Sequence, residues 1–124
     1  MSGNRAERVA NRVRQVLMEL LVRGALRDPG AQDVYVTHVC VSNDLRTARV
    51  YVRVLDCREP SRRQAAVSAL QRGNGRLRRL LGPRLALRHT PKLSFVWDGG
   101  EERAARIDAL LDEIHLEGKG EAKT

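Results

Sequence analysis

The segment Leu70–Gly82, LQRGNGRLRRLLG, has the pattern of two short helices joined at Gly73-Asn74-Gly75. A helix interior rarely carries two glycines, because each costs about 1 kcal/mol relative to alanine. In the second half, leucines fall on one arc of the helix and arginines on the opposite arc. We therefore expect one helix to end near Arg72 and a second to run from about Gly75 to Leu81.

The residues before this helix pair predict one helix and two strands. Residues 4–24 carry apolar side chains at helical spacing, and Gly24 is a typical stop. Two strands follow, joined by a turn at residues 42–44. The apolar alternation changes parity inside the first strand, which predicts a β-bulge near Thr37-His38. In the second strand, alternate positions carry Arg49, Tyr51 and Arg53, which predicts a basic, open sheet face.

The residues on either side of the kink complete the order of elements. Ser61 with Gln64 three residues later has the spacing of a capping box at the start of the first helix. Alternating apolar residues over 85–97 predict a third strand, and Pro91 favours an edge position or a bent lead-in. Residues 107–114 predict a last helix, and a polar tail follows from about His115.

The order of predicted elements is αββααβα, which is typical of a small α+β domain. The chain has 124 residues, of which 42% are hydrophobic, so we expect one domain with one modest core. Helices should cover one face of a three-stranded sheet. We place this domain at residues 1–115 and a flexible tail at residues 116–124.

The charge of the chain is strongly basic and unevenly distributed. The net charge is +8, and residues 60–97 contain nine Arg or Lys and no Asp or Glu. Residues 98–124 are net acidic. A concentrated positive potential attracts polyanions, of which nucleic acid is the leading candidate and an anionic membrane surface the second. A solvated arginine face without a partner is the alternative.

Other classes of protein are less well supported. No apolar run reaches the roughly 18 residues that a membrane span needs, so we expect a cytoplasmic protein. No nucleophile, phosphate-loop or dinucleotide motif appears, so we expect neither an enzyme nor a bound cofactor. His38, Cys40 and Cys57 would form only an incomplete metal site, and we interpret them as ordinary side chains.

The glycine-containing kink suggests how a nucleic acid would bind. Glycines at a helix junction allow unusual backbone conformations and let a phosphate approach the main chain. The next helix presents unpaired N–H groups and the positive end of its dipole. RNA-binding KH domains use a similar junction of two helices. A bend required only by packing is the alternative interpretation.

With only four aromatic residues, the chain favours contacts to phosphate and shape over base stacking. The candidate RNA-binding residues are Arg8, Arg12, Arg49, Arg53, Arg72, Gly73, Asn74, Gly75, Arg76, Arg78, Arg79, Arg84, Arg88 and Lys92.

Several short motifs together resemble the bacterial ribosome-binding factor A family. They are Asp28-Pro29, VSNDL at Val41–Leu45, ARVYVRVL at Ala48–Leu55 and LRHTPKLSFVWD at Leu87–Asp98. Family members carry an Ala-x-Gly kink where KH domains have a glycine loop. Here Gly73 stands at the alanine position, which leaves the role of this kink open.

The resemblance implies a single KH-like (type II) domain that is not an enzyme. We expect the protein to be a monomer. It implies binding to the immature 30S small ribosomal subunit and to 16S rRNA, a role in processing the rRNA 5′ end and in adaptation to cold, and release before translation begins. The alternative from another class is a KH-fold protein adaptor, whose acidic last helix binds a basic partner.

Overall fold

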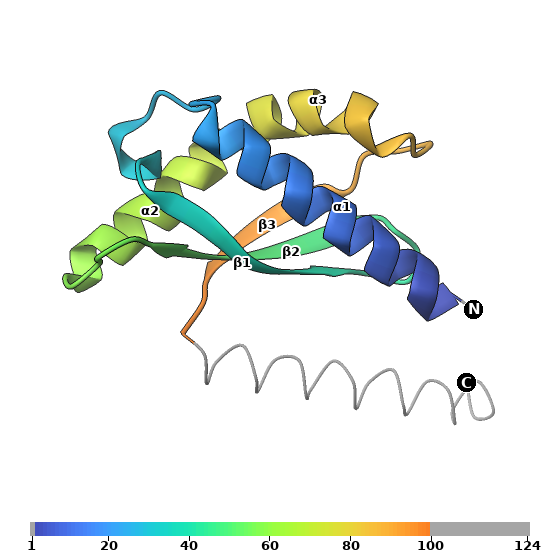
Figure 1. Cartoon of the computed structure of the whole chain (residues 1–124), viewed down its shortest axis with the longest axis horizontal. Helices are drawn as coiled ribbons and strands as arrows, with labels where there is room; N and C mark the ends of the chain where they lie inside the picture. Colours follow the sequence, from blue (N-terminus) through green and yellow to red (C-terminus); the bar gives the residue numbers. More distant parts are fainter. Residues whose placement is uncertain (1, 100–124) are drawn as a thin grey trace.

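The computed structural model describes residues 2–99, in which three helices pack on one face of a three-stranded sheet (Figure 1). The elements are α1 (Ser2–Val22), the short 3₁₀ helix η1 (Pro29–Ala31), β1 (Val34–Val41), β2 (Thr47–Val54), α2 (Pro60–Arg72), α3 (Asn74–Leu85) and β3 (Lys92–Trp97). The described elements confirm the predicted α+β class and the kinked helix pair. The predicted last helix and the tail lie outside the described residues.

The sheet is mixed, with strand order β1-β2-β3. β1 and β2 pair antiparallel, and β3 pairs parallel to β2 after the crossover through α2 and α3. β3 is therefore an edge strand, as predicted from Pro91. The register of β1 and β2 shifts between Val36 and His38, which confirms the predicted bulge at Thr37. No helix within residues 2–99 has the length and hydropathy to cross a membrane.

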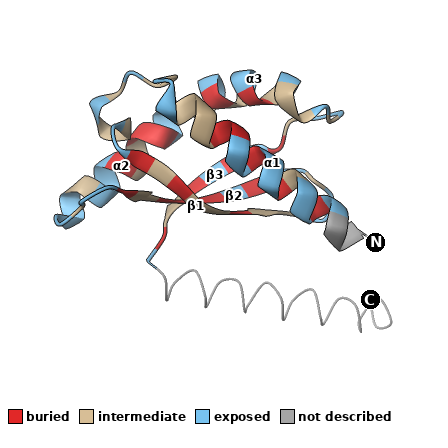
Figure 2. Ribbon diagram, viewed as in Figure 1, coloured by how far each residue is buried: buried red, intermediate tan, exposed pale blue. Residues whose placement is uncertain are grey.

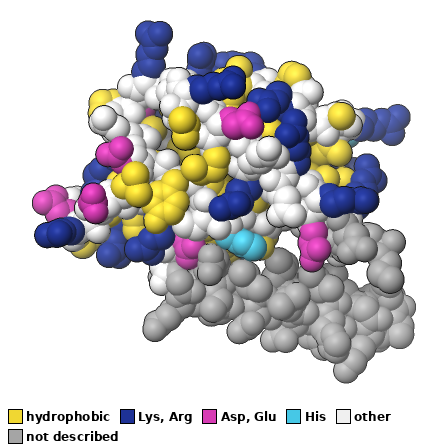
Figure 3. Space-filling view, viewed as in Figure 1, with side chains coloured by type: hydrophobic (Ala, Val, Ile, Leu, Met, Phe, Trp, Pro, Cys, Tyr) yellow, Lys and Arg dark blue, Asp and Glu magenta, His cyan; other side chains and the backbone are white. Residues whose placement is uncertain are grey.

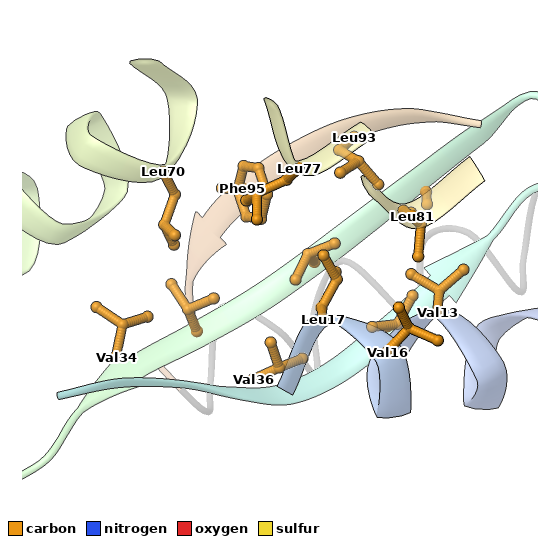
Figure 4. Packing of buried hydrophobic residues seen from close by; sticks show 14 of the residues in the cluster. Val13, Val16, Leu17, Val34, Val36, Leu70, Leu77, Leu81, Leu93 and Phe95 are labelled. Atoms are coloured by element: carbon orange, nitrogen blue, oxygen red, sulfur yellow. The ribbon is translucent and has the colours of Figure 1, made fainter. Parts of the chain in front are cut away.

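The core lies between the helices and the sheet, because each helix turns one apolar stripe toward it. Figure 2 shows the buried residues on the inner sides of the helices. Val13 and Leu17 of α1, Leu77 of α3 and Phe95 of β3 meet in one cluster (Figure 4). The spacing of four residues between Val13 and Leu17 is the helical repeat that the sequence displays.

Local backbone signals end α1 where the sequence predicts. Gly24 adopts a left-handed conformation with φ of +75°. The N–H of Gly24 donates to the carbonyl of Leu21 at 3.1 Å, and that of Ala25 to the carbonyl of Leu20 at 2.9 Å. This pair of hydrogen bonds is the Schellman motif, in which a left-handed residue is most easily a glycine.

Two sequence-based predictions about element ends are wrong. The N-cap residue of α2 is Glu59, without a side-chain cap hydrogen bond, so Ser61 forms no capping box. Pro60 already occupies the first helical position, and its fixed φ suits that position. Residue 85 belongs to α3 rather than to the third strand, because Leu77, Leu81 and Leu85 recur at the helical spacing of four.

Candidate nucleic-acid interface

The kink between α2 and α3 contains two glycines with different surroundings. Gly73 has φ of −88° and ψ of 5°, so the expected unusual backbone conformation is wrong at this position. A Cβ atom at Gly73 would overlap the side chain of Leu26, so close packing explains this glycine. Gly75 is exposed, and a Cβ atom there would meet nothing within 4 Å. Only Gly75 leaves open space at the first turn of α3.

The first turn of α3 is anchored to the sheet. Asn74 Nδ2 donates to the carbonyl of Leu93 in β3 at 2.8 Å. The N–H of Leu77 donates to its helical partner, the carbonyl of Gly73, at 3.0 Å. Earlier N–H groups in the turn have no acceptor within the helix, as at any helix start. This turn can therefore offer backbone donors to an anion beside Gly75.

A groove of about 580 Å³ runs beside the kink and carries three arginines. Arg72 Nε and Nη2 donate to Asp28 Oδ2 at 3.0 and 2.7 Å. These hydrogen bonds from Arg72, together with the Gly30 N–H, hold the pKa of Asp28 below its usual value. Arg76 Nε donates to the carbonyl of Ala25 at 2.7 Å. Arg72 and Arg76 thus tie the kink to the loop after α1.

A second basic groove, of about 270 Å³, lies between α1 and the end of α3. Its lining residues are Arg5, Arg8, Val9, Arg12 and Leu85. Arg5, Arg8 and Arg12 recur at spacings of three and four, which places them on one face of α1. Arg5 is absent from the sequence-based candidates, although this spacing is visible in the sequence.

Arg84 joins the two helices beside that groove. Its Nη2 lies 2.7 Å from Glu19 Oε2, and its carbonyl accepts a long hydrogen bond of 3.4 Å from Arg12 Nε. The hydrogen bond from Arg84 lowers the pKa of Glu19. Arg84 therefore links α1 to α3, and its ion pair with Glu19 makes its charge less available to a ligand.

Two further candidates are occupied by backbone carbonyls. Arg78 Nε donates to Pro91 at 3.1 Å and its Nη2 to Thr90 at 2.9 Å, so this side chain holds the lead-in to β3. Arg53 Nη1 donates to the carbonyl of Asp98 at 2.6 Å, and its guanidinium lies 5.2 Å from the centre of the Trp97 ring. We interpret Arg53 and Arg78 as structural residues.

The sheet face opposite the helices is less open than predicted. Tyr51 is only 2% exposed, although the sequence pattern placed it on an open face. Its ring lies 6.0 Å from the ring of His38, its cross-strand neighbour in β1. Arg49 and Lys92 are exposed on this side, because their neighbours in each strand face the core. They lie on the opposite side of the sheet from α1 and α3.

The remaining candidates on the helical side have uncommitted charges. Arg8, Arg79 and Arg88 are exposed, and their side chains make no hydrogen bond or ion pair with residues 2–99. Figure 3 shows Lys and Arg side chains over α3 and toward the N-terminal half of α1. We call Arg5, Arg8, Arg12, Arg79 and Arg88 the α1–α3 basic surface.

Comparisons with known proteins agree with this fold. Residues 5–111 match the family model of ribosome-binding factor A. The chain is 37% identical to ribosome-binding factor A of Gloeobacter violaceus, over 98% of this chain and 95% of the relative. The structure is similar to the crystal structure of ribosome-binding factor A from Thermus thermophilus, with a TM-score of 0.61 and 30% sequence identity. The match covers 73% of this chain and 93% of the Thermus thermophilus chain. A homology model of the Thermus thermophilus factor, fitted into a cryo-EM map of a 30S–RbfA complex, matches with 30% identity and a TM-score of 0.52 over 71% and 94%.

Proposed function

The chain belongs to the ribosome-binding factor A family, and we propose that it binds the immature 30S subunit through 16S rRNA. In this proposal the protein is a binding factor, without catalysis of its own, that supports maturation of the 5′ end of 16S rRNA. The Thermus thermophilus relative fitted into a map of a 30S complex supports the choice of the small subunit as partner.

The observation that carries the proposal is the uncommitted charge of three members of the α1–α3 basic surface. Arg8, Arg79 and Arg88 spend no hydrogen bond on the described part of the fold, so phosphate binding would not compete with folding contacts. Gly75 adds open backbone at the start of α3, the helix that carries Arg79. Phosphate contacts of this kind position an RNA without reading its bases.

The test compares two double variants that remove equal charge. Arg79→Ala/Arg88→Ala removes two members of the α1–α3 basic surface. Arg14→Ala/Arg58→Ala removes two exposed arginines outside it, neither of which makes a side-chain hydrogen bond with the described residues. Affinity for purified immature 30S subunits and for 16S rRNA is measured by filter binding between 50 and 200 mM salt.

We expect the first double variant to lose at least about tenfold in affinity and to reduce the salt slope by about 0.7–0.9 per arginine. The control should keep the wild-type affinity and slope. Equal losses in both variants would mean that only net charge matters, and would contradict a defined surface. Binding by the wild type that hardly changes with salt would favour the protein adaptor instead.

The role in rRNA maturation has its own measurement. Cells in which the Arg79→Ala/Arg88→Ala variant replaces the wild-type protein should accumulate 16S rRNA with unprocessed 5′ ends, seen by primer extension. Cells with the Arg14→Ala/Arg58→Ala variant should process the end normally. Normal processing in both strains would refute this part of the proposal.

A further inference from the structure

The sheet face opposite the helices contains two buried polar side chains. Tyr51 is 2% exposed and Asp98 is 4% exposed. Successive residues of a strand point to opposite faces, so Tyr51 points away from its neighbour Val50, which belongs to the core. By the same alternation, Asp98 lies on the side of Val96, away from the core residue Phe95. Both buried side chains therefore lie on the face that the helices of residues 2–99 leave uncovered (Figure 1).

The neighbours of Tyr51 on this face belong to the same sheet. His38 is its partner in β1, with the two ring centres 6.0 Å apart, and Val96 is its partner in β3. Such neighbours flank a ring at its sides, whereas the outer surface of a sheet without a second layer stays in contact with water. An exposed fraction of 2% therefore indicates a further layer on this face, and the chain after Gly99 can supply it.

The end of β3 is held over this face. The N–H of Asp98 donates to the carbonyl of Val52 at 2.9 Å, and Arg53 Nη1 donates to the carbonyl of Asp98 at 2.6 Å. Thr37 Oγ1, at the bulge of β1, lies 2.5 Å from Asp98 Oδ2 and 3.2 Å from the carbonyl oxygen of Tyr51. Although β3 is an edge strand, the Asp98 carboxylate thus reaches β1, and the chain continues from a point beside Tyr51.

The sequence that follows has the pattern of a covering helix. The apolar stripe of the helix predicted at residues 107–114 consists of Ile107, Leu110, Leu111 and Ile114. Residues 101–106 are Glu, Arg and Ala, which are strong helix formers, so the helix can begin at Glu101. A helix over residues 101–114 is about 21 Å long, and the eight residues of β2 span about 26 Å. The segment is therefore long enough to run back across the sheet.

The charges of this face and of the segment are opposite. β1, β2 and β3 contain no Asp or Glu, and their charged residues are Arg49, Arg53 and Lys92. Arg49 and Lys92 are exposed and make no side-chain hydrogen bond or ion pair within residues 2–99. Asp44, in the turn before β2, is offset by Arg46 two residues later. Residues 101–114 contain five acidic and two basic residues, a net charge of −3, so electrostatics supports the contact that the burial of Tyr51 indicates.

We propose that residues 101–114 bind as an amphipathic helix to the sheet face opposite α1, α2 and α3. The apolar stripe covers Tyr51 and Val96, and acidic side chains beside the stripe lie near Arg49 and Lys92. This contact and the α1–α3 basic surface lie on opposite sides of the sheet. The inference therefore goes beyond the proposed function and does not depend on it.

The direct test is nuclear Overhauser spectroscopy on the full, isotope-labelled chain. We expect cross-peaks between the methyl groups of the apolar stripe and the ring of Tyr51, because these groups are in contact in the proposal. Leu110→Ser/Leu111→Ser removes half of the stripe without a change in charge, and it should lose these cross-peaks. The backbone cross-peaks between β1 and β2 should remain, which shows that the sheet is still folded.

The matched control changes the other side of the same helix. Ala105 and Ala109 fall opposite the apolar stripe at helical spacing. Ala105→Ser/Ala109→Ser places the same two new residues in the segment, so it should keep the wild-type cross-peaks to Tyr51.

The reactivity of a thiol gives a second readout. Cys40 is the partner of Arg49 in the β1–β2 register and therefore lies on the proposed contact face. In a Cys57→Ser background, Leu110→Ser/Leu111→Ser should make Cys40 react severalfold faster with Ellman's reagent, because the face becomes accessible. The Ala105→Ser/Ala109→Ser control should react at the rate of the Cys57→Ser protein.

Three results would overturn the inference. The first is a wild-type chain without cross-peaks between the apolar stripe and Tyr51. The second is a mixture of labelled and unlabelled chains in which these cross-peaks arise only between chains, since a second copy would then cover the face. The third is equal loss of the cross-peaks in the two serine variants. Failure of the proposed function would instead be seen in RNA binding, and would leave the cross-peaks unchanged.

Discussion

Gly73 and Gly75 stand two residues apart, but different physical conditions explain them. At Gly73 the side chain of Leu26 occupies the space that a Cβ atom would need. At Gly75 the space is empty and the backbone is helical, so the glycine carries a conformational cost without a packing benefit. A residue that lowers stability without a structural reason in the described fold is a candidate for function.

We predict opposite effects of alanine at the two positions on the free energy of unfolding in urea. Gly73→Ala should destabilise by about 1–3 kcal/mol, because Leu26 must move. Adding Leu26→Ala should make the double variant more stable than the sum of the two single changes predicts. Gly75→Ala should stabilise by about 0.4–1 kcal/mol. Strictly additive effects of Gly73→Ala and Leu26→Ala would contradict the packing explanation.

Gly75→Ala also tests whether a phosphate approaches the start of α3. The added methyl group should lower the affinity for 16S rRNA while the unfolding free energy rises, because it would occupy space that the phosphate uses. Filter binding and urea unfolding on the same preparation separate the two effects. An unchanged rRNA affinity would mean that this turn does not contact the RNA. The α1–α3 basic surface would then be the only proposed RNA contact on the helices.

At the scale of elements, η1 packs so closely against α2 that position 30 has room only for a glycine. A Cβ atom at Gly30 would lie 2.8 Å from the carbonyl oxygen of Ala65 and 2.9 Å from Ala69 Cβ. Arg62 fastens the contact, because its Nη1 donates to the carbonyl of Gly30 at 2.8 Å and its Nη2 to that of Gln32. By holding η1 against α2, these hydrogen bonds fix the position of Asp28, which in turn pairs with Arg72 at the kink.

Arg62→Gln should therefore destabilise the protein by about 1–3 kcal/mol, since two carbonyls lose a charged donor. Ser61→Ala, the neighbouring change in α2, should alter the unfolding free energy by less than about 0.5 kcal/mol, because Ser61 is exposed and provides no cap. Urea unfolding of both variants measures the difference. A larger loss from Ser61→Ala than from Arg62→Gln would restore the capping box.

At the scale of the whole molecule, three carboxylates tie stability to pH. Hydrogen bonds from Arg84, Arg72 and Ser42, respectively, lower the pKa values of Glu19, Asp28 and Asp44. Because the folded pKa lies below the unfolded value, each group adds stability above about pH 4, and this stability disappears as the pH falls through the folded pKa. Protonation also increases the net charge above +8, which destabilises in the same direction.

We expect the urea midpoint of the wild type to fall steadily from about pH 5 to about pH 3. Asp28→Asn should start from a lower midpoint at neutral pH and fall less, because it lacks one of the three carboxylates. Midpoints measured at intervals of half a pH unit test this. Parallel curves for the wild type and the variant would show that the Asp28–Arg72 pair does not contribute.

Much of the fold could be predicted because its helices and strands follow from the local periodicity of apolar residues. The valine alternation of β1 and β2, the parity change at the bulge and the break at Gly73 each depend on neighbours a few residues away. The wrong predictions concern positions where two local signals compete. Near Ser61 the helix begins at Pro60 instead of following the capping pattern. Leu85 belongs to a helix because it continues the helical spacing of leucines, although it also fits the alternation of a strand.

The sequence by itself determined the kinked helix pair, the edge strand, the family and the sign of the surface charge. Only the tertiary structure decided which arginine side chains are engaged by other residues of the fold. Arg72 meets Asp28 across 44 residues, and Arg84 meets Glu19 across 65. A guanidinium binds whichever carbonyl or carboxylate the fold brings within about 3 Å, and no local pattern contains that partner. The same is true of the groove beside the kink, which exists only where α2, α3 and the loop after α1 meet.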